Sequence, residues 1–162
     1  MCGGFFLGGE IMNSDDEKYM KQAYKEALKA KEIDEVPIGC VIVKDDKIIA
    51  RGYNKKERNN DVTSHAEINA IRKACKKMNS WRLVDCTLYV TLEPCSMCAG
   101  AIYQSRIKRV VFGAYDLKQG ALGSALNLYS INTLNHFPEV EGGVLKDECS
   151  SLISSYFKEK RK

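Results

Sequence analysis

The apolar and polar positions of this chain alternate between helical and strand periodicity along its length. Apolar residues first recur at helical spacing behind Ser14 and Glu17, which together form a capping box. β-Branched runs then alternate with further helical patterns. In order, the pattern predicts a helix over about 14–32, strands over 38–44 and 47–53, a helix from Ser64 to about Met78, a strand over 86–92, a helix starting at Pro94, a strand over 108–114, a helical turn over 126–129, a strand over 140–145 and a helix over 147–160.

This order of elements predicts an α/β fold. The turn-favouring pair Asp45-Asp46 joins the first two strands as a hairpin, and later strands alternate with helices. The expected architecture is three-layer α/β/α with a mixed central sheet of about five strands. With 162 residues, 44% of them hydrophobic, the chain suits one domain. We expect residues 1–13 to be a disordered leader, without the basic start of a signal peptide, and residues 14–162 to form the domain.

The net charge of +4 is mild, but the cations are grouped. Such groups are usually solvated faces, and the last one fits a frayed tail. If several groups converge on one cleft, they instead suit a phosphate backbone, so both interpretations stay open. The groups are Arg51, Lys55, Lys56 and Arg58; Arg72, Lys73, Lys76 and Lys77; Arg106, Lys108 and Arg109; and Lys158, Lys160, Arg161 and Lys162.

The seven cysteines are an odd number and lack the dense spacing of a secreted disulfide scaffold. A reducing compartment, and so a cytoplasmic location, is the better expectation. Cys40 and Cys86 lie inside apolar runs and are predicted to be core residues. No apolar run approaches the length of a membrane span, so we expect no membrane partner.

Two short motifs carry the candidate chemistry. Cys95 and Cys98 are three residues apart at a predicted helix start, where the helix dipole favours thiolates. A Cys-x-x-Cys pair alone also fits a redox pair or two buried residues. His65-x-Glu67 followed about thirty residues later by Pro94-Cys95-x-x-Cys98 is far more specific. One imidazole and two thiolates leave the fourth tetrahedral position of zinc open, which is typical of a catalytic site.

Glu67 has two interpretations at this stage. Ser64 and Glu67 fit a capping box, in which the carboxylate would bond the Ser64 amide. Beside an open metal position, Glu67 is instead the base that takes a proton from the metal's water. His136 has no ligand partner at useful spacing and is expected to be structural. Closure of the metal site by Cys75 or Cys86 is disfavoured, because neither position points at the metal.

The complete set predicts a hydrolytic reaction on a nucleobase. Zinc lowers the pKa of its bound water toward neutrality, so the site can hold a hydroxide against an electron-poor ring carbon. Glu67 would carry the proton to a ring nitrogen and then to the departing ammonia. The chemistry is deamination, and the motifs match the general signature of zinc-dependent nucleobase deaminases.

With its flanking blocks, the sequence resembles the bacterial tRNA-specific adenosine deaminases of the zinc-dependent cytidine and deoxycytidylate deaminase superfamily. These enzymes convert the wobble adenosine of a tRNA anticodon to inosine. The similarity runs from about Tyr19 to Phe157. It is densest in Glu35-Val36-Pro37-Ile38-Gly39, in Gly52-Tyr53-Asn54, in Ala66-Glu67-Ile68, over 88–100 (LYVTLEPCSMCAG) and over 105–116 (SRIKRVVFGAYD).

The resemblance implies a cytidine deaminase-like fold and a residue-by-residue assignment. It makes His65, Cys95 and Cys98 the ligands of one Zn²⁺ per subunit, and Glu67 the proton shuttle. It also implies substrate contacts from Asn54 to the target base or its sugar, from Val36 as the apolar wall, from Ala66, from Asp116 near the flipped nucleotide, and from Tyr156 and Phe157 near the anticodon loop.

Each substrate contact has an ordinary structural alternative. Turn chemistry alone explains Asn54 and Asp116. Core packing alone explains Val36, Tyr156 and Phe157. These alternatives stay open on the sequence.

The resemblance further implies a tRNA anticodon stem-loop as partner and a homodimer. An anticodon loop suits the chemistry because its unpaired base can be splayed into a pocket at low unstacking cost. Two rival functions remain. One is a deaminase of a free base or nucleotide, such as cytosine, guanine or deoxycytidylate, on the same fold. The other is a zinc-stabilised RNA-binding module without catalysis.

Overall fold

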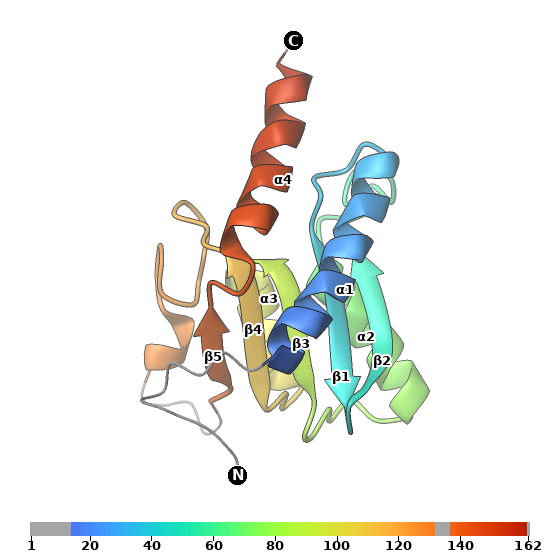
Figure 1. Ribbon diagram of the computed structural model, residues 1–162. Coiled ribbons are helices and arrows are strands. Elements are labelled where there is room, and N and C mark those ends of the chain that lie inside the picture. Colours follow the sequence, from blue (N-terminus) through green and yellow to red (C-terminus); the bar gives the residue numbers. More distant parts are fainter. Residues whose placement is uncertain (1–13, 132–136, 162) are drawn as a thin grey trace.

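The protein is a five-stranded mixed sheet between two layers of helices (Figure 1), seen in a computed structural model that describes residues 14–131 and 137–161. The predicted leader and His136 lie outside the described residues. The elements are α1 (Ser14–Glu32), β1 (Gly39–Lys44), β2 (Lys47–Tyr53), α2 (Ala66–Met78), β3 (Thr87–Leu92), α3 (Ser96–Gln104), β4 (Arg109–Ala114), the 3₁₀ turn η1 (Leu128–Ser130), β5 (Glu139–Gly142) and α4 (Lys146–Lys160).

The strand order β2-β1-β3-β4-β5 contains one reversed strand. β1 is antiparallel to both of its neighbours, β2 and β3, whereas β4 and β5 continue parallel to β3. Consequently β2 and β3 run in the same direction although they do not touch. The α/β class and the mixed five-stranded sheet predicted from the sequence are confirmed.

Two hydrophobic cores lie on the two faces of this sheet. Successive side chains of a strand point to opposite faces, so each central strand contributes to both cores. In β1, for example, Ile42 belongs to the core under α2 and α3, and Val41 to the core under α1 and α4. Because both faces are covered, the central strands read in sequence as continuous apolar runs rather than alternating ones. Cys40 and Cys86 are fully buried in the first core, as predicted.

The hairpin turn between β1 and β2 confirms the prediction at Asp45-Asp46. Both residues have left-handed backbone, with φ of 52° and 61°, the conformation that a tight hairpin turn requires. Two later elements differ from expectation. The strand expected over 140–145 ends at Gly142, because Gly143 turns the chain with φ of 90°. The expected helical turn over 126–129 is the 3₁₀ turn η1.

A buried ion pair ties the start of α1 to the start of β4. Asp16 is 2% exposed, and both of its oxygens accept hydrogen bonds from the Arg109 guanidinium at 2.8 Å. The hydroxyl of Tyr89 donates to the same carboxylate at 2.9 Å. This cluster lies at the edge of the sheet where β4 begins, opposite the edge where β3 and β4 end. Among the described helices, none has the length and apolar character needed to cross a membrane.

Candidate metal centre

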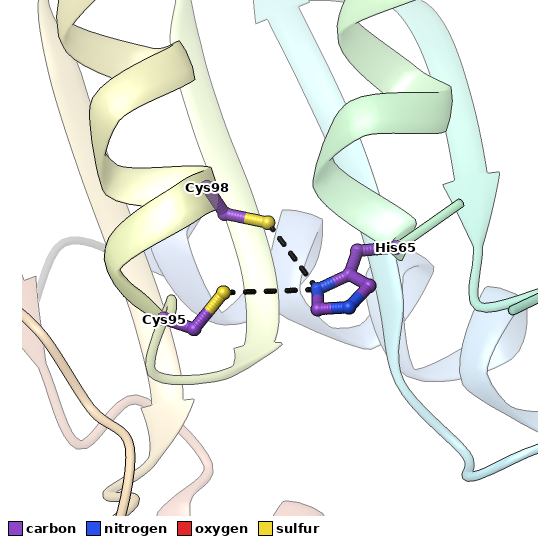
Figure 2. Close-up of side chains that lie close together, drawn as sticks. All are labelled: His65, Cys95 and Cys98. Atoms are coloured by element: carbon purple, nitrogen blue, oxygen red, sulfur yellow. Dashed lines mark hydrogen bonds between the residues drawn. The ribbon is translucent and has the colours of Figure 1, made fainter. Parts of the chain in front are cut away.

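The shared direction of β2 and β3 brings the two sequence motifs together. Each strand is followed by a helix packed on the same face of the sheet, so α2 and α3 begin at the same edge. His65 occupies the N-cap position of α2, and Cys95 occupies the N-cap position of α3. Cys98 lies in the first turn of α3. Figure 2 shows all three side chains pointing toward one another from these helix starts.

The three ligand atoms have the spacing of a small tetrahedral site. The Nδ1 atom of His65 lies 3.7 Å from the Cys95 Sγ and 3.5 Å from the Cys98 Sγ. All the ligand atoms lie within 4.8 Å of one another. Zinc bonds to nitrogen and sulfur of ordinary length would separate the two atoms by about 3.6 Å at a tetrahedral angle. The donor set and its spacing therefore fit zinc without rearrangement.

Both helices start slightly later than the sequence suggested. The helix expected from Pro94 begins at Ser96, because Cys95 has extended backbone with ψ of 177°. The helix expected from Ser64 begins at Ala66, because His65 is likewise extended with ψ of 159°. The extended cap residues turn one ligand from each motif back toward the other. Cys95 thus precedes the helix that was expected to carry it.

Gly52 allows the first turn of α2 to lie directly on β2. A Cβ atom at Gly52 would stand 2.6 Å from both the Ala66 carbonyl oxygen and the Ala70 amide nitrogen, closer than real contacts allow. Ala66 and Ala70 are themselves fully buried. The small residues on both sides therefore set the depth at which the helix start, and with it His65, rests against the sheet.

The two thiols of the site influence each other strongly. The Cys98 thiol donates a hydrogen bond to Cys95, which lowers the pKa of Cys95 to about 4, with a further contribution from His65. The same hydrogen bond, together with burial, holds the pKa of Cys98 far above its usual range. Both pKa shifts arise mainly from the contact between these two cysteines.

Glu67 lies buried beside the three candidate ligands, and the capping alternative is wrong. Glu67 is 4% exposed, and burial raises the pKa of its carboxyl to about 7. The Ser64 amide, which a capping box would pair with Glu67, donates instead to the Asp61 carbonyl at 3.0 Å. Within the described part of the chain, no side-chain hydrogen bond caps the start of α2.

Asn54 and Val36 join two segments that are far apart in sequence. The Asn54 side-chain amide donates to the Val36 carbonyl at 3.3 Å, and its Oδ1 accepts from the Lys56 amide at 3.1 Å. Asn54 is 7% exposed and Val36 is half-buried. The turn role considered for Asn54 is therefore present. It fixes the orientation of the Asn54 amide.

Asp116 shows the turn chemistry that was its alternative interpretation. Its Oδ1 accepts hydrogen bonds from the amides of Lys118 and Gln119, each at 3.1 Å. The residue is half-buried and lies two residues after the end of β4, at the edge of the sheet where the candidate ligands meet. Local hydrogen bonds thus give the carboxylate a fixed place at this edge.

Tyr156 and Phe157 behave differently although they are neighbours. Tyr156 is buried, and its hydroxyl donates to the backbone oxygen of Asp34 at 3.0 Å and to its carboxylate at 3.1 Å. Phe157 is 44% exposed and meets the Tyr156 ring edge-on, 5.4 Å between centroids. Packing therefore explains Tyr156, while Phe157 presents an aromatic face. In Figure 1 the end of α4 projects past the sheet.

The basic groups predicted from the sequence differ in whether their cations are paired with carboxylates. Arg109 is paired with Asp16, Arg51 is 3.5 Å from Glu26, and Lys160 is 2.8 Å from Asp34. In contrast, Lys56 and Arg58 stand exposed on the loop between β2 and His65, with Lys55 half-buried beside them.

Two buried glutamates at this edge lie in the blocks that carry the family resemblance, but no role was predicted for them. Glu35 and Glu93 are each 2% exposed, and both accept hydrogen bonds from backbone amides of neighbouring loops. The signal for them is an acidic residue one or two positions before a proline in an otherwise apolar stretch, as in Leu92-Glu93-Pro94. Such a residue is buried only if its carboxylate is fully hydrogen-bonded.

Comparisons with known proteins identify the relatives of this chain. The family model of the MafB19-like deaminases matches residues 14–160. The tRNA-specific adenosine deaminase of Bacillus subtilis (strain 168) is 51% identical over 149 residues, 92% of each chain. A solved tRNA:A34 deaminase, from work on A-to-I editing at the wobble position of transfer RNA, aligns with a TM-score of 0.81 at 47% identity, over 83% of this chain and 98% of its own. Guanine deaminase from Bacillus subtilis aligns with a TM-score of 0.59 at 45% identity, over 64% of this chain and 66% of its own.

Proposed function

The chain belongs to the family of tRNA-specific adenosine deaminases, and on that basis we propose that it converts the wobble adenosine of a tRNA anticodon to inosine by hydrolysis. The observation that carries the proposal is the meeting of His65, Cys95 and Cys98 beside the buried carboxyl of Glu67. A purely structural metal site has no use for an acid–base group held in contact with its ligands.

The metal of this proposal is one Zn²⁺ per subunit, held by His65, Cys95 and Cys98. Three protein ligands of this softness suit zinc better than the oxygen-seeking Mg²⁺ or Ca²⁺. When bound there, zinc supplies Lewis-acid activation of water by lowering its pKa toward neutrality. Cys75 and Cys86 are not part of the ligand group found among the described residues.

Glu67 moves the protons in this scheme. Its carboxyl takes one proton from the water whose oxygen adds to the ring carbon and gives it to the adjacent ring nitrogen; it then takes the proton of the new hydroxyl and gives it to the amino group, which leaves as ammonia as the C–N bond breaks. Val36 would form the apolar wall against the ring, and Ala66, at the start of α2, would contribute to the substrate site beside it. Asn54 keeps an N–H of its fixed amide to offer to the base or its sugar.

The RNA of this proposal is the anticodon stem-loop, with the target base splayed out of the loop. Asp116 would meet the flipped nucleotide, and the exposed ring of Phe157, backed by Tyr156, would stack near the loop. A cytoplasmic homodimer is the setting that we propose with it. The exposed cations Lys56 and Arg58 lie on the site side and suit phosphates.

The decisive experiment compares two kinds of substrate. The purified protein is incubated with an anticodon stem-loop carrying a wobble adenosine and, separately, with adenine, guanine, cytosine and deoxycytidylate. We expect inosine in the stem-loop by mass spectrometry and no turnover of the free compounds. Turnover of guanine with an unchanged stem-loop would favour the rival function, which the 45% identity to a guanine deaminase makes the natural alternative.

A further inference from the structure

We propose that Glu93 is a positioning residue that fixes the loop of residues 115–125 (the Asp116 loop) relative to the metal centre, so that the loop meets the substrate in a preset shape. The proposal rests on the function proposed above. It assigns a role to a buried group that neither binds the metal nor takes part in proton transfer.

Glu93 uses both carboxylate oxygens on the Asp116 loop. Its Oε1 accepts from the Asp116 amide at 3.1 Å and from the Ser124 hydroxyl at 2.5 Å. Its Oε2 accepts from the amides of Leu122 at 3.0 Å and Ser124 at 3.1 Å. The donors come from the beginning and the end of the loop, so a single side chain closes it into one shape. Charge-assisted hydrogen bonds of this kind are stronger than neutral ones.

The backbone around Glu93 joins the same loop to the metal-binding turn. Glu93 stands between the end of β3 and Pro94, two residues before the ligand Cys95. Its own amide donates to the Ala114 carbonyl at 2.8 Å, and the Ala121 amide donates to the Pro94 carbonyl at 2.8 Å. A displacement of the loop should therefore shift the backbone at Glu93 and Pro94, next to Cys95, and a shift of this backbone should displace the loop.

Gly120 shows how closely the loop is fitted around this carboxylate. A Cβ atom at Gly120 would stand 2.4 Å from the Glu93 Cδ and 2.5 Å from the Asp116 carbonyl oxygen. Only glycine leaves room for the anchor and the turn together. The loop is thus built around the Glu93 side chain rather than merely bonded to it.

The anchored loop presents side chains that the core does not use. Leu117 is 80% exposed and Tyr115 is 48% exposed, and they flank Asp116. The Tyr115 ring is held edge-on by Phe112 at 5.1 Å between centroids. Large apolar side chains held in water on a fixed loop are typical of a binding surface. Glu93 therefore sets where this surface lies relative to the reacting base.

The variant Glu93→Gln tests the proposal, because an amide nitrogen cannot accept the N–H groups that one oxygen accepts now. Hydrogen exchange at the Asp116, Leu122 and Ser124 amides should accelerate more than tenfold. The kcat/KM for the anticodon stem-loop should fall by about 10- to 100-fold, mainly through KM, with zinc content unchanged. Ser124→Ala, which removes one of the four bonds, should move the same quantities in the same direction by less.

Asp16→Asn is the matched control, since it also neutralises a buried carboxylate but at the opposite edge of the sheet. It should lower the melting temperature without changing loop exchange or KM. If Glu93→Gln changes only the melting temperature, as this control does, the proposal is overturned. Loss of zinc from Glu93→Gln would also overturn it, in favour of a role in the metal-binding turn. If Glu93→Gln does not fold, Ser124→Ala decides.

The proposed function and the positioning role of Glu93 fail in different ways. If the wild-type protein leaves the stem-loop unchanged, the proposed function is wrong, and hydrogen exchange still decides whether Glu93 holds the loop. If the wild-type protein makes inosine, but hydrogen exchange in the loop and KM are unchanged in Glu93→Gln and Ser124→Ala, only the positioning role is wrong.

Discussion

Buried carboxylates stand at both edges of the sheet, and they are held in opposite ways. Where β4 begins, Asp16 pairs with the guanidinium of Arg109 and accepts from the hydroxyl of Tyr89. Where β3 and β4 end, Glu93 and Glu35 bond backbone amides of loops, and Glu93 takes the Ser124 hydroxyl besides. At the first edge, the negative charge of the carboxylate is balanced by a positively charged side chain. At the other edge, the carboxylates are stabilised by hydrogen bonds from backbone N–H groups.

The difference separates stability from function. An ion pair between α1 and β4 fastens two elements of the core together and leaves loops free to vary. Carboxylates that are hydrogen-bonded to loop amides need no positively charged partner near the candidate site. They fix the conformation of the loops instead. We therefore expect changes at the Asp16 edge to affect folding, and changes at the metal edge to affect chemistry and binding.

The largest effect in this comparison is expected from Glu67→Gln. The amide keeps the shape of the side chain but cannot move protons, so turnover should fall by about 10²- to 10⁴-fold. Zinc content and the free energy of unfolding should stay near those of the wild type. Inosine by mass spectrometry and zinc by elemental analysis measure both quantities. A variant that keeps full activity would support the RNA-binding module without catalysis.

Asp16→Asn should have the opposite effect, lowering stability while leaving turnover unchanged. Removing one partner of a buried pair leaves Arg109 without its counter-charge, which destabilises the fold by about 3 kcal/mol, the low end for such pairs because the Arg109 side chain is 22% exposed. Denaturant unfolding measures this loss. The kcat for the folded fraction should be unchanged, and a large fall in kcat would break the division between the two edges.

The cations of the loop between β2 and His65 offer a smaller and more graded test. Each lysine or arginine that neutralises a phosphate releases counterions from the RNA, so its removal makes binding less sensitive to salt. Replacing Lys55, Lys56 and Arg58 by glutamine should therefore reduce the salt dependence of tRNA binding by about one unit of slope for each phosphate that is no longer neutralised.

The matched control replaces Lys73, Lys76 and Lys77 in the second half of α2, about 12 to 18 Å along the helix axis from His65. Filter binding over a range of salt concentrations compares the two sets. If the salt dependence of tRNA binding is unchanged by the first set of substitutions, or changes equally with both sets, the proposed position of the RNA at the metal edge is contradicted.

The smallest effect is expected from the exposed Asp34, which joins the end of α4 to the segment before β1. Hydrogen bonds from Lys160 and Tyr156 hold the pKa of the Asp34 carboxyl below its usual range. The folded state thus favours the ionised form, so its contribution is complete above the unfolded pKa and disappears as the pH falls through the folded value. In the acid range, Asp34→Asn should therefore show a flatter loss of stability than the wild type, measured by thermal unfolding at stepped pH. Identical curves would exclude this contribution.

Much of the fold was readable because each signal was local or periodic. The first helix was predicted with its observed bounds, and the Asp45-Asp46 turn has the backbone that the pair favours. The convergence of His65 with the two cysteines was predicted from residue types and spacing alone. The starts of α2 and α3 were missed by two residues, because extended cap residues leave no mark in the pattern of apolar positions.

The anchoring role of the two glutamates was missed for a different reason. A carboxylate bonded to amides is defined by the loop that surrounds it, and the donors of Glu93 lie more than twenty residues further along the chain. The competing assignment of Glu67 to a capping box failed because the Ser64 amide is used by Asp61. Both facts depend on tertiary hydrogen bonds, which a single sequence does not encode in any short window.

The reversed strand β1 also suggests the order in which the strands pair during folding. β1 and β2 pair across a two-residue turn, whereas β3 must return over about forty residues to reach β1, and short closures are the faster ones. A growing chain that ends at Met78 holds one ligand, and the other two arrive with β3 and α3. Capture of the proposed zinc therefore has to follow the arrival of α3, and refolding with a chelator should leave formation of the β1–β2 hairpin unchanged and alter only later steps.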